Sequence, residues 1–171
     1  MEMCKKSISM KMYDALSWHV THIESKKEML FKEYYNEETE ESKKFEAFFK
    51  AYLLALTTYL DSVAIGPEGK NECPFVIIGS IVEVFDHCEN DSYRYHIVLP
   101  YSGQSGSDVD YASCLSPLGS ALLFKTLNEK VNVEIPTGTL HYTIKKITFP
   151  GSPTGTVQEP AVPDQKLSFG N

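Results

Sequence analysis

The chain has 171 residues and a formal net charge of −7, and 42% of its residues are hydrophobic and 12% aromatic. This length fits one compact domain with an appendage or two small domains, and the composition is sufficient to bury a core. No segment is strongly basic, which argues against duplex DNA binding through phosphate neutralisation and favours a protein partner.

The cysteines are widely spaced, without a CxxC pair, at positions 4, 73, 88 and 114. This spacing argues against a cysteine-based metal site and against a disulfide framework, and it fits scattered thiols in a reducing compartment. No hydrophobic run approaches the ~20 residues of a membrane span. The first residues lead into Ser, Met and Lys rather than an apolar signal core. We therefore expect a cytoplasmic protein that does not act at a membrane.

Two heptad patterns occupy residues 1–65. Their spacing predicts two helices, and a short connector between them predicts an antiparallel helical hairpin, a coiled coil roughly 35–40 Å long. Only Lys27 interrupts the apolar series. The first series is Tyr13, Leu16, Val20, Ile23, Lys27, Leu30 and Tyr34, and the second is Phe45, Phe49, Tyr52, Leu56, Tyr59 and Val63.

The connector of this arm, residues 35–42, is rich in glutamate. Asn36 is a candidate N-cap for a second helix that begins at Glu37, where the helix dipole favours acidic side chains. A solvated helix start is the ordinary interpretation of these glutamates. The alternative is that Glu37 and Glu38 offer carboxylates to Mg²⁺, which often takes one or two carboxylates plus water. A rigid arm could deliver them into the active site of another protein.

A linker over residues 66–74 follows, with a run of turn-forming residues from Gly66 to Glu72. In residues 75–149 the hydrophobic period changes to two, which predicts strands. An apolar run over 75–78 leads into the first strand, and further strands are expected near residues 93–99, 110–115, 131–135 and 140–147. The predicted fold class is α+β, with a helical hairpin followed by a small antiparallel sheet and one short helix.

The short helix has a clear entry signal. Ser116 is a good N-cap, and Pro117 stands at the first helical position, where its fixed φ suits the helix. An apolar stretch over residues 118–123 continues the helix. The last segment, residues 150–171, contains four prolines without periodicity and is expected to be a flexible tail.

Residues 75–149 resemble the C-terminal domain of the Gre transcription-elongation factors. Order and spacing both agree, and the matching elements are Ile78-Gly79-Ser80, Tyr95-His96-Ile97-Val98-Leu99-Pro100, the Ser-Pro-Leu-Gly-Ser-Ala-Leu-Leu run at 116–123, Pro136-Thr137-Gly138 and Tyr142-Thr143-Ile144-Lys145-Lys146-Ile147. The resemblance implies an FKBP-like fold for this domain. The hairpin matches the Gre architecture by pattern only.

The sequence departs from the Gre pattern at several positions. Phe124 stands where the family usually has Gly, Asn128-Glu129 replaces a usual Gly-Asp, and Leu99 replaces another common Gly. We expect these to be loop and surface positions that leave the fold intact. At the arm tip, the Asp-x-x-Glu-Asn-x-Glu-Tyr motif of cleavage-stimulating Gre factors is absent, so its catalytic Asp has no counterpart here.

The resemblance implies a transcription-elongation factor that is not itself an enzyme and has no intrinsic cofactor. Its partner would be bacterial RNA polymerase, with Ser116, Pro117, Leu118 and Gly119 as candidate docking residues on the rim of the secondary channel. The arm would enter the channel, where Glu37 and Glu38 could share a Mg²⁺ with the polymerase close to the nascent RNA. A non-cleaving regulator that occupies the same channel is the alternative, and the missing tip motif favours it.

Three weaker possibilities concern an isomerase activity, a histidine metal site and the tyrosines of the arm tip. An FKBP-like fold raises the question of prolyl isomerase activity, but fold does not determine function. His19 and His22, three residues apart, could hold a metal, although a place on the helix surface or at a domain contact is the ordinary interpretation. Tyr34 and Tyr35 are expected to close the hairpin by packing, with stacking on nucleic acid as the alternative.

Overall fold

The protein is described by a computed structural model covering residues 7–67, 69, 72–102 and 109–149. The chain divides into two compact units, residues 1–71 and 72–171. The first contains α1 (Met10–Tyr34) and α2 (Glu40–Ser62), and the second contains five strands and α3. The expected tail over residues 150–171 lies outside the described residues. In the described part of the chain, no helix is both long and apolar enough to cross a bilayer.

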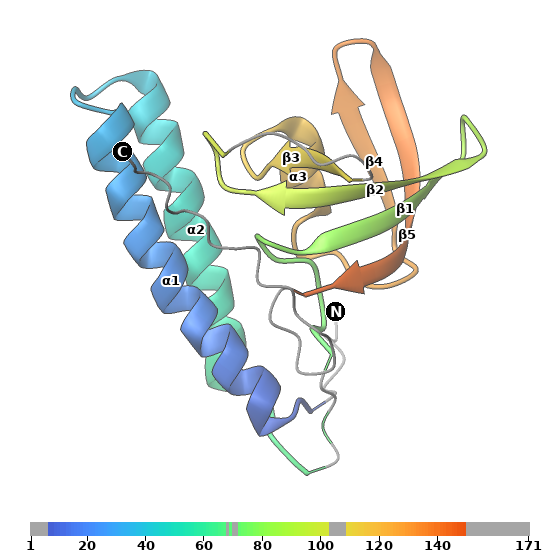
Figure 1. The fold of residues 1–171 in the computed structure, drawn as a ribbon, viewed down its shortest axis with the longest axis horizontal. Coiled ribbons are helices and arrows are strands. Elements are labelled where there is room, and N and C mark those ends of the chain that lie inside the picture. The colour runs from blue at the N-terminus through green and yellow to red at the C-terminus, as the bar shows by residue number, and fades with distance from the viewer. Residues whose placement is uncertain (1–6, 68, 70–71, 103–108, 150–171) are drawn as a thin grey trace, which may run out of the picture. The chain divides into compact units, whose positions relative to one another are not determined.

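The first unit is the predicted antiparallel hairpin (Figure 1). At ~1.5 Å per residue its helices are about 35–37 Å long, as expected. Most of the predicted heptad positions in its middle are buried, namely Leu16, Val20, Ile23, Phe45, Phe49, Tyr52 and Leu56. At the base, Ile8 is 2% exposed and donates its N–H to the Ala64 carbonyl, while Gly66 N–H donates to the Ile8 carbonyl. These bonds tie the two ends of the hairpin together.

The predicted start of the second helix is wrong. Helix α2 begins at Glu40, and its N-cap is Thr39 rather than Asn36. Thr39 Oγ1 accepts from Ser42 N–H at 3.1 Å, and Ser42 Oγ accepts from Thr39 N–H at 2.9 Å. This reciprocal capping box satisfies two helix-terminal donors at once, whereas a cap at Asn36 would satisfy one. Glu37 and Glu38 therefore lie in the connector, before the helix.

His19 is buried, so the expected position on the helix surface is wrong. Its Nε2 lies 2.8 Å from the Tyr52 hydroxyl of the opposite helix. Burial, and secondarily the charge of His22, lowers the pKa of His19 from 6.5 to about 4. His22 instead stacks on Trp18 with the ring centroids 4.7 Å apart. The two histidines thus have separate surroundings and do not form a pair of metal ligands.

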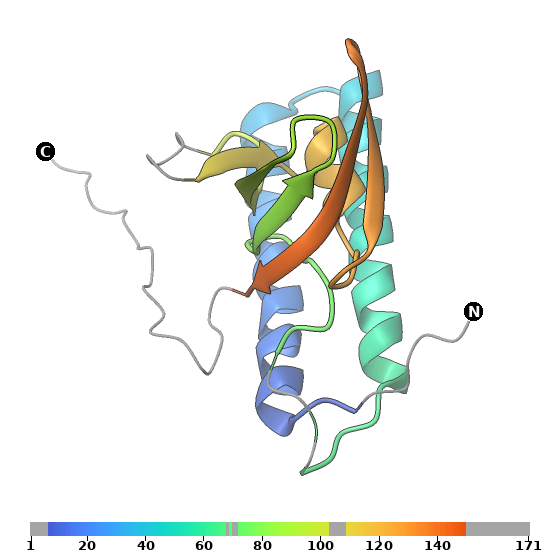
Figure 2. The same cartoon turned by 90° about the vertical axis from the view of Figure 1, so that its right-hand side faces the viewer.

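The second unit is α+β, but its sheet is mixed rather than antiparallel. The strand order is β3-β2-β1-β5-β4, with bounds β1 Ile81–Asp86, β2 Asp91–Val98, β3 Asp110–Ser113, β4 Lys130–Ile135 and β5 Gly138–Thr148. All neighbours pair antiparallel except β3, which runs parallel to β2. β3 begins opposite Tyr95, in the middle of β2, and residues 99–109 supply the crossover connection that parallel pairing requires. Figure 2 shows the sheet curled, with the β4–β5 ribbon projecting beyond it.

The apolar run over residues 75–78 is buried but does not form a strand of the sheet. Val76 exchanges two backbone hydrogen bonds with residues 124 and 125, and the chain then turns at Gly79, whose φ is +100°. Such a φ is readily available to glycine. Ser80 is fully buried, and its Oγ accepts from Ile77 N–H at 3.0 Å. These bonds give the Ile78-Gly79-Ser80 motif a structural role at the entry to β1.

Two departures from the Gre pattern occupy left-handed backbone positions. Phe124 has φ +67° and Asn128 has φ +70°. Asn tolerates this conformation, whereas for other non-glycine residues it costs about 1–2 kcal/mol. Phe124 is half-buried rather than a surface residue, and its ring meets Phe75 edge-on at 5.5 Å. An aromatic pair of this kind contributes about 0.5–1.5 kcal/mol beyond its buried area, which offsets the backbone strain.

We predict that acid weakens the hairpin through His19. The His19 side chain binds a proton near pH 6.5 in the unfolded chain but only near pH 4 in the folded chain. The contribution of neutral His19 to the free energy of unfolding is therefore complete above pH 6.5 and declines as the pH falls toward 4. Between pH 7.5 and 5.0 the wild type should lose about 2 kcal/mol more than His19→Gln, which keeps a polar atom but does not titrate. Urea unfolding followed by helical circular dichroism measures both. Equal losses in the two proteins would contradict the assignment.

Candidate functional site

The segment between β3 and α3 (Pro117–Leu122) forms a tightly bonded turn. Ser116 is the N-cap, as predicted: its Oγ accepts from Gly119 N–H at 3.0 Å and donates to the Ser113 carbonyl at 2.7 Å. Ser116 N–H donates to the same carbonyl at 3.0 Å. Pro117 occupies the first turn of α3. The direction in which α3 leaves the sheet is therefore fixed by side-chain and backbone bonds together.

Gly119 is required by close packing in this turn. It is buried, and a Cβ at this position would overlap the carbonyl group of Ser113. Its role is therefore to let the first turn of α3 approach the end of β3. Helix α3 then packs on β3 and β4 and buries Leu122 completely.

The four predicted docking residues divide into two kinds. Ser116 and Gly119 hold the turn, whereas Pro117 is exposed and Leu118 is half-buried. Leu115, which is not among the predicted docking residues, is 38% exposed and lies within the turn. An apolar side chain next to an exposed proline on a rigid turn can contact another protein at little entropic cost.

The arm tip is held by packed aromatic rings. Tyr35 lies 4.9 Å from Phe45 and 5.7 Å from Phe31, measured between ring centroids, and Phe45 continues to Phe49 at 4.7 Å. Tyr35 therefore closes the hairpin by packing, as predicted. Tyr34 is 45% exposed instead.

The glutamates of the tip are all exposed and form a loose acidic surface, comprising Glu33, Glu37, Glu38, Glu40 and Glu41. Among the described residues, no group of three or more His, Cys, Asp or Glu side chains is arranged to hold a metal ion. Glu37 and Glu38 by themselves could supply only part of a Mg²⁺ coordination sphere.

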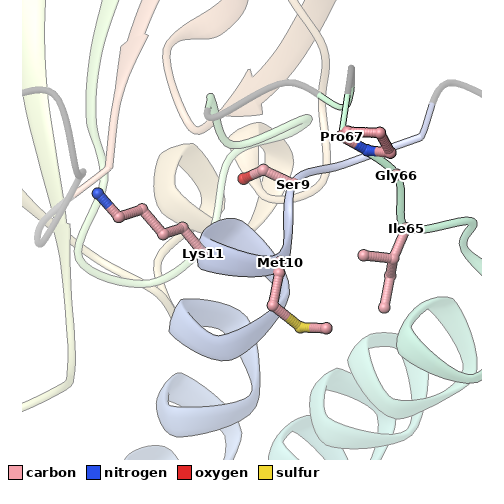
Figure 3. Close-up of a pocket in the computed structure, with 6 residues that line it drawn as sticks. All are labelled: Ser9, Met10, Lys11, Ile65, Gly66 and Pro67. Atoms are coloured by element: carbon pink, nitrogen blue, oxygen red, sulfur yellow. The ribbon is translucent and has the colours of Figure 1, made fainter.

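A hollow of about 470 Å³ lies at the base of the hairpin, lined by Ser9, Met10, Lys11, Ile65, Gly66 and Pro67. Figure 3 shows that the Lys11 side chain points away from the other lining residues. No polar groups converge on the hollow from among these six residues. It therefore has the character of a surface depression rather than a binding site.

The family model described as "Transcription elongation factor, GreA/GreB, C-term" matches residues 71–149. The chain is 32% identical over 112 residues to transcription elongation factor GreA of Caldanaerobacter subterraneus subsp. tengcongensis, covering 66% of this chain and 70% of the relative. This chain belongs to the GreA/GreB family. Transcription elongation factor GreA of Clostridioides difficile is also 32% identical, over 117 residues, covering 66% of this chain and 69% of that protein.

Solved structures of GreA/GreB-type proteins are also similar to this chain, at lower sequence identity. GreA factor homolog 1 (Gfh1) of Thermus thermophilus is 20% identical with a TM-score of 0.39, covering 83% of this chain and 97% of that chain. GreA/GreB from Nitrosomonas europaea is 18% identical with a TM-score of 0.42, covering 86% and 100%. Similarities of this size are too low to bear on the function.

We predict that Gly119→Ala destabilises this GreA/GreB-family domain. Alanine normally favours a helix by about 1 kcal/mol over glycine, but here the added methyl group should force the turn apart and cost about 1–3 kcal/mol. The neighbouring Ser120→Ala, at an exposed position of the same helix, should change the free energy of unfolding by less than about 0.5 kcal/mol. Denaturant unfolding measures both variants. A stabilising Gly119→Ala would refute the close-packing role.

Proposed function

We propose that the protein binds bacterial RNA polymerase and regulates transcript elongation through the polymerase secondary channel. The observation that carries the proposal is that the family match spans the β-rich unit, on which a rigid turn exposes Pro117 and leaves Leu118 half-buried. Curated relatives at about 32% identity are transcription elongation factors. A bacterial polymerase partner would place the protein in the cytoplasm.

The two units would have different roles in this function. The β-rich unit docks on the rim of the channel, and the hairpin, at about 35–37 Å, serves as an arm that reaches inward. The exposed Glu37 and Glu38 at its tip would supply carboxylates to a Mg²⁺ that the polymerase also holds. The polymerase performs the chemistry, and this chain is not itself an enzyme.

A second candidate function is a regulator that occupies the channel without stimulating cleavage. The observation that favours it is the absence of the Asp-x-x-Glu-Asn-x-Glu-Tyr motif from the sequence. In that case the arm acts by occupancy, competing with other channel-binding factors, and the exposed glutamates serve as a solvated tip.

The FKBP-like description of the β-rich unit stays an expectation that follows from the resemblance to Gre factors. We propose no prolyl isomerase activity on that ground, because the fold does not determine the function.

We predict that a double substitution at the exposed part of the turn weakens polymerase binding. Pro117→Ala/Leu118→Ala removes apolar contact area without touching Ser116 or Gly119, and should raise the Kd for RNA polymerase at least ten-fold. Leu127→Ala/Pro136→Ala is the matched control, since both residues are exposed in the same unit. Binding measured by co-purification and by titration should be unchanged in the control. No binding by the wild type, or equal losses in both variants, would refute the docking role.

Cleavage of nascent RNA in a stalled elongation complex separates the two candidate functions. If the tip shares a metal ion, the wild type releases short 3′ fragments, and Glu37→Gln/Glu38→Gln reduces the rate at least ten-fold. Glu40→Gln/Glu41→Gln, which alters two exposed residues of the first turn of α2, should keep most of the rate. A wild type that binds polymerase but releases no fragment would rule out stimulation and leave the non-cleaving regulator.

A further inference from the structure

Three tyrosines gather on one face of the sheet, apart from the docking turn. Tyr93 and Tyr95 of β2 lie opposite Val84 and Val82 of β1, on the face whose β1 residues are buried. The Tyr95 ring centroid is 6.5 Å from that of Tyr93 and 6.2 Å from that of Tyr142 on β5, and the Tyr95 and Tyr142 hydroxyls are 3.3 Å apart. We call these three residues the tyrosine platform.

The platform lies at the margin of the core, with its three rings buried to different degrees. Tyr142 is 3% exposed, but Tyr93 and Tyr95 are only half-buried. Half-buried tyrosine rings offer both apolar contact and hydrogen bonding through their hydroxyl groups, and aromatic side chains are what proline-rich segments in the polyproline II conformation bind.

The turn between β1 and β2 makes the border of the platform acidic. Glu89 and Asp91 are exposed, and the Tyr93 hydroxyl donates to Glu89 Oε1 at 3.5 Å. The buried Asp86 holds the turn, because its Oδ1 accepts from Cys88 N–H at 2.8 Å and from Glu89 N–H at 3.1 Å. A ligand that fits here combines a proline-rich stretch with a nearby positive charge.

The chain contains such a sequence in its own last segment. Residues 160–166 read Pro160-Ala-Val-Pro163-Asp164-Gln-Lys166, a Pro-x-x-Pro pattern followed by Asp164 and by Lys166, the one cation in the sequence of residues 150–171. Pro-x-x-Pro segments favour the polyproline II conformation, which loses little entropy on binding. These residues lie outside the described part of the structure.

The length of chain between β5 and this motif suits binding to the same molecule. Tyr142 lies six residues before the end of β5 at Thr148, which is about 20 Å at ~3.3 Å per residue. Residues 150–159 span up to about 31 Å at ~3.1 Å per residue. The first Pro-x-x-Pro pattern, Pro150-Gly-Ser-Pro153, follows β5 too closely to fold back that far.

We propose that residues 160–166 of the same chain bind the tyrosine platform, with Lys166 beside Glu89 and Asp91. The inference concerns a surface other than the docking turn and the arm tip, so it stands independently of the proposed polymerase function.

The test compares two tail variants of the full chain by ¹H–¹⁵N NMR. Pro160→Ala/Pro163→Ala should shift the amide signals of Tyr93, Tyr95 and Tyr142 and of the turn over residues 86–91. The matched control Pro150→Ala/Pro153→Ala should leave those signals in place. Neither variant alters a residue of the sheet or of α3, so the folding of the sheet is not at stake. Unchanged platform signals in both variants would overturn the proposal.

A peptide of residues 158–168 then identifies the occupant. Added to the Pro160→Ala/Pro163→Ala chain, it should bind the open platform. It should bind the wild type at least ten-fold more weakly, because a tethered segment competes at an effective concentration in the mM range. Lys166→Glu in the peptide should weaken binding further. Equal affinity for both proteins, or wild-type platform signals that change with protein concentration as in exchange between two copies, would contradict binding within one chain.

Discussion

The carbonyl oxygen of Ser113 is the constraint on which the β-rich unit depends most. It accepts from both the backbone N–H and the hydroxyl of Ser116, and it leaves no room for a side chain at Gly119. These contacts fix the angle at which α3 leaves β3, and with it the packing of α3 on β3 and β4. The same turn presents Pro117 to solvent. Stability of the unit and its proposed docking surface therefore arise from one short segment.

Much of the fold could be predicted because burial repeats with a fixed period. The heptads of the hairpin, the N-cap at Ser116 and the strand alternation all encode short-range geometry that the sequence displays directly. The start of α2 is harder to predict, because Asn36 and Thr39 are both good N-caps and the reciprocal hydrogen bond from Ser42 decides between them. The parallel pairing of β3 depends on where a long connection returns the chain, which side-chain periodicity does not encode.

The candidate sites show the same division. The sequence indicated residues 116–119 as one group, but only three-dimensional packing separates the structural Ser116 and Gly119 from the exposed Pro117. The burial of His19 against Tyr52 could not be predicted either, because a histidine next to the apolar heptad positions can equally well lie on the helix surface. The glutamates of the tip are exposed, as a solvated surface or a shared-ion site both require. Their chemistry depends on what the partner contributes.

Hydrogen–deuterium exchange of the full chain with and without bacterial RNA polymerase reports on the docking turn and the arm tip at once. We expect polymerase to slow amide exchange around residues 115–120 and in the connector before α2, while the β4–β5 turn near Pro136 keeps its rate. Unchanged exchange around residues 115–120 in the presence of polymerase, or protection confined to the β4–β5 turn, would contradict it.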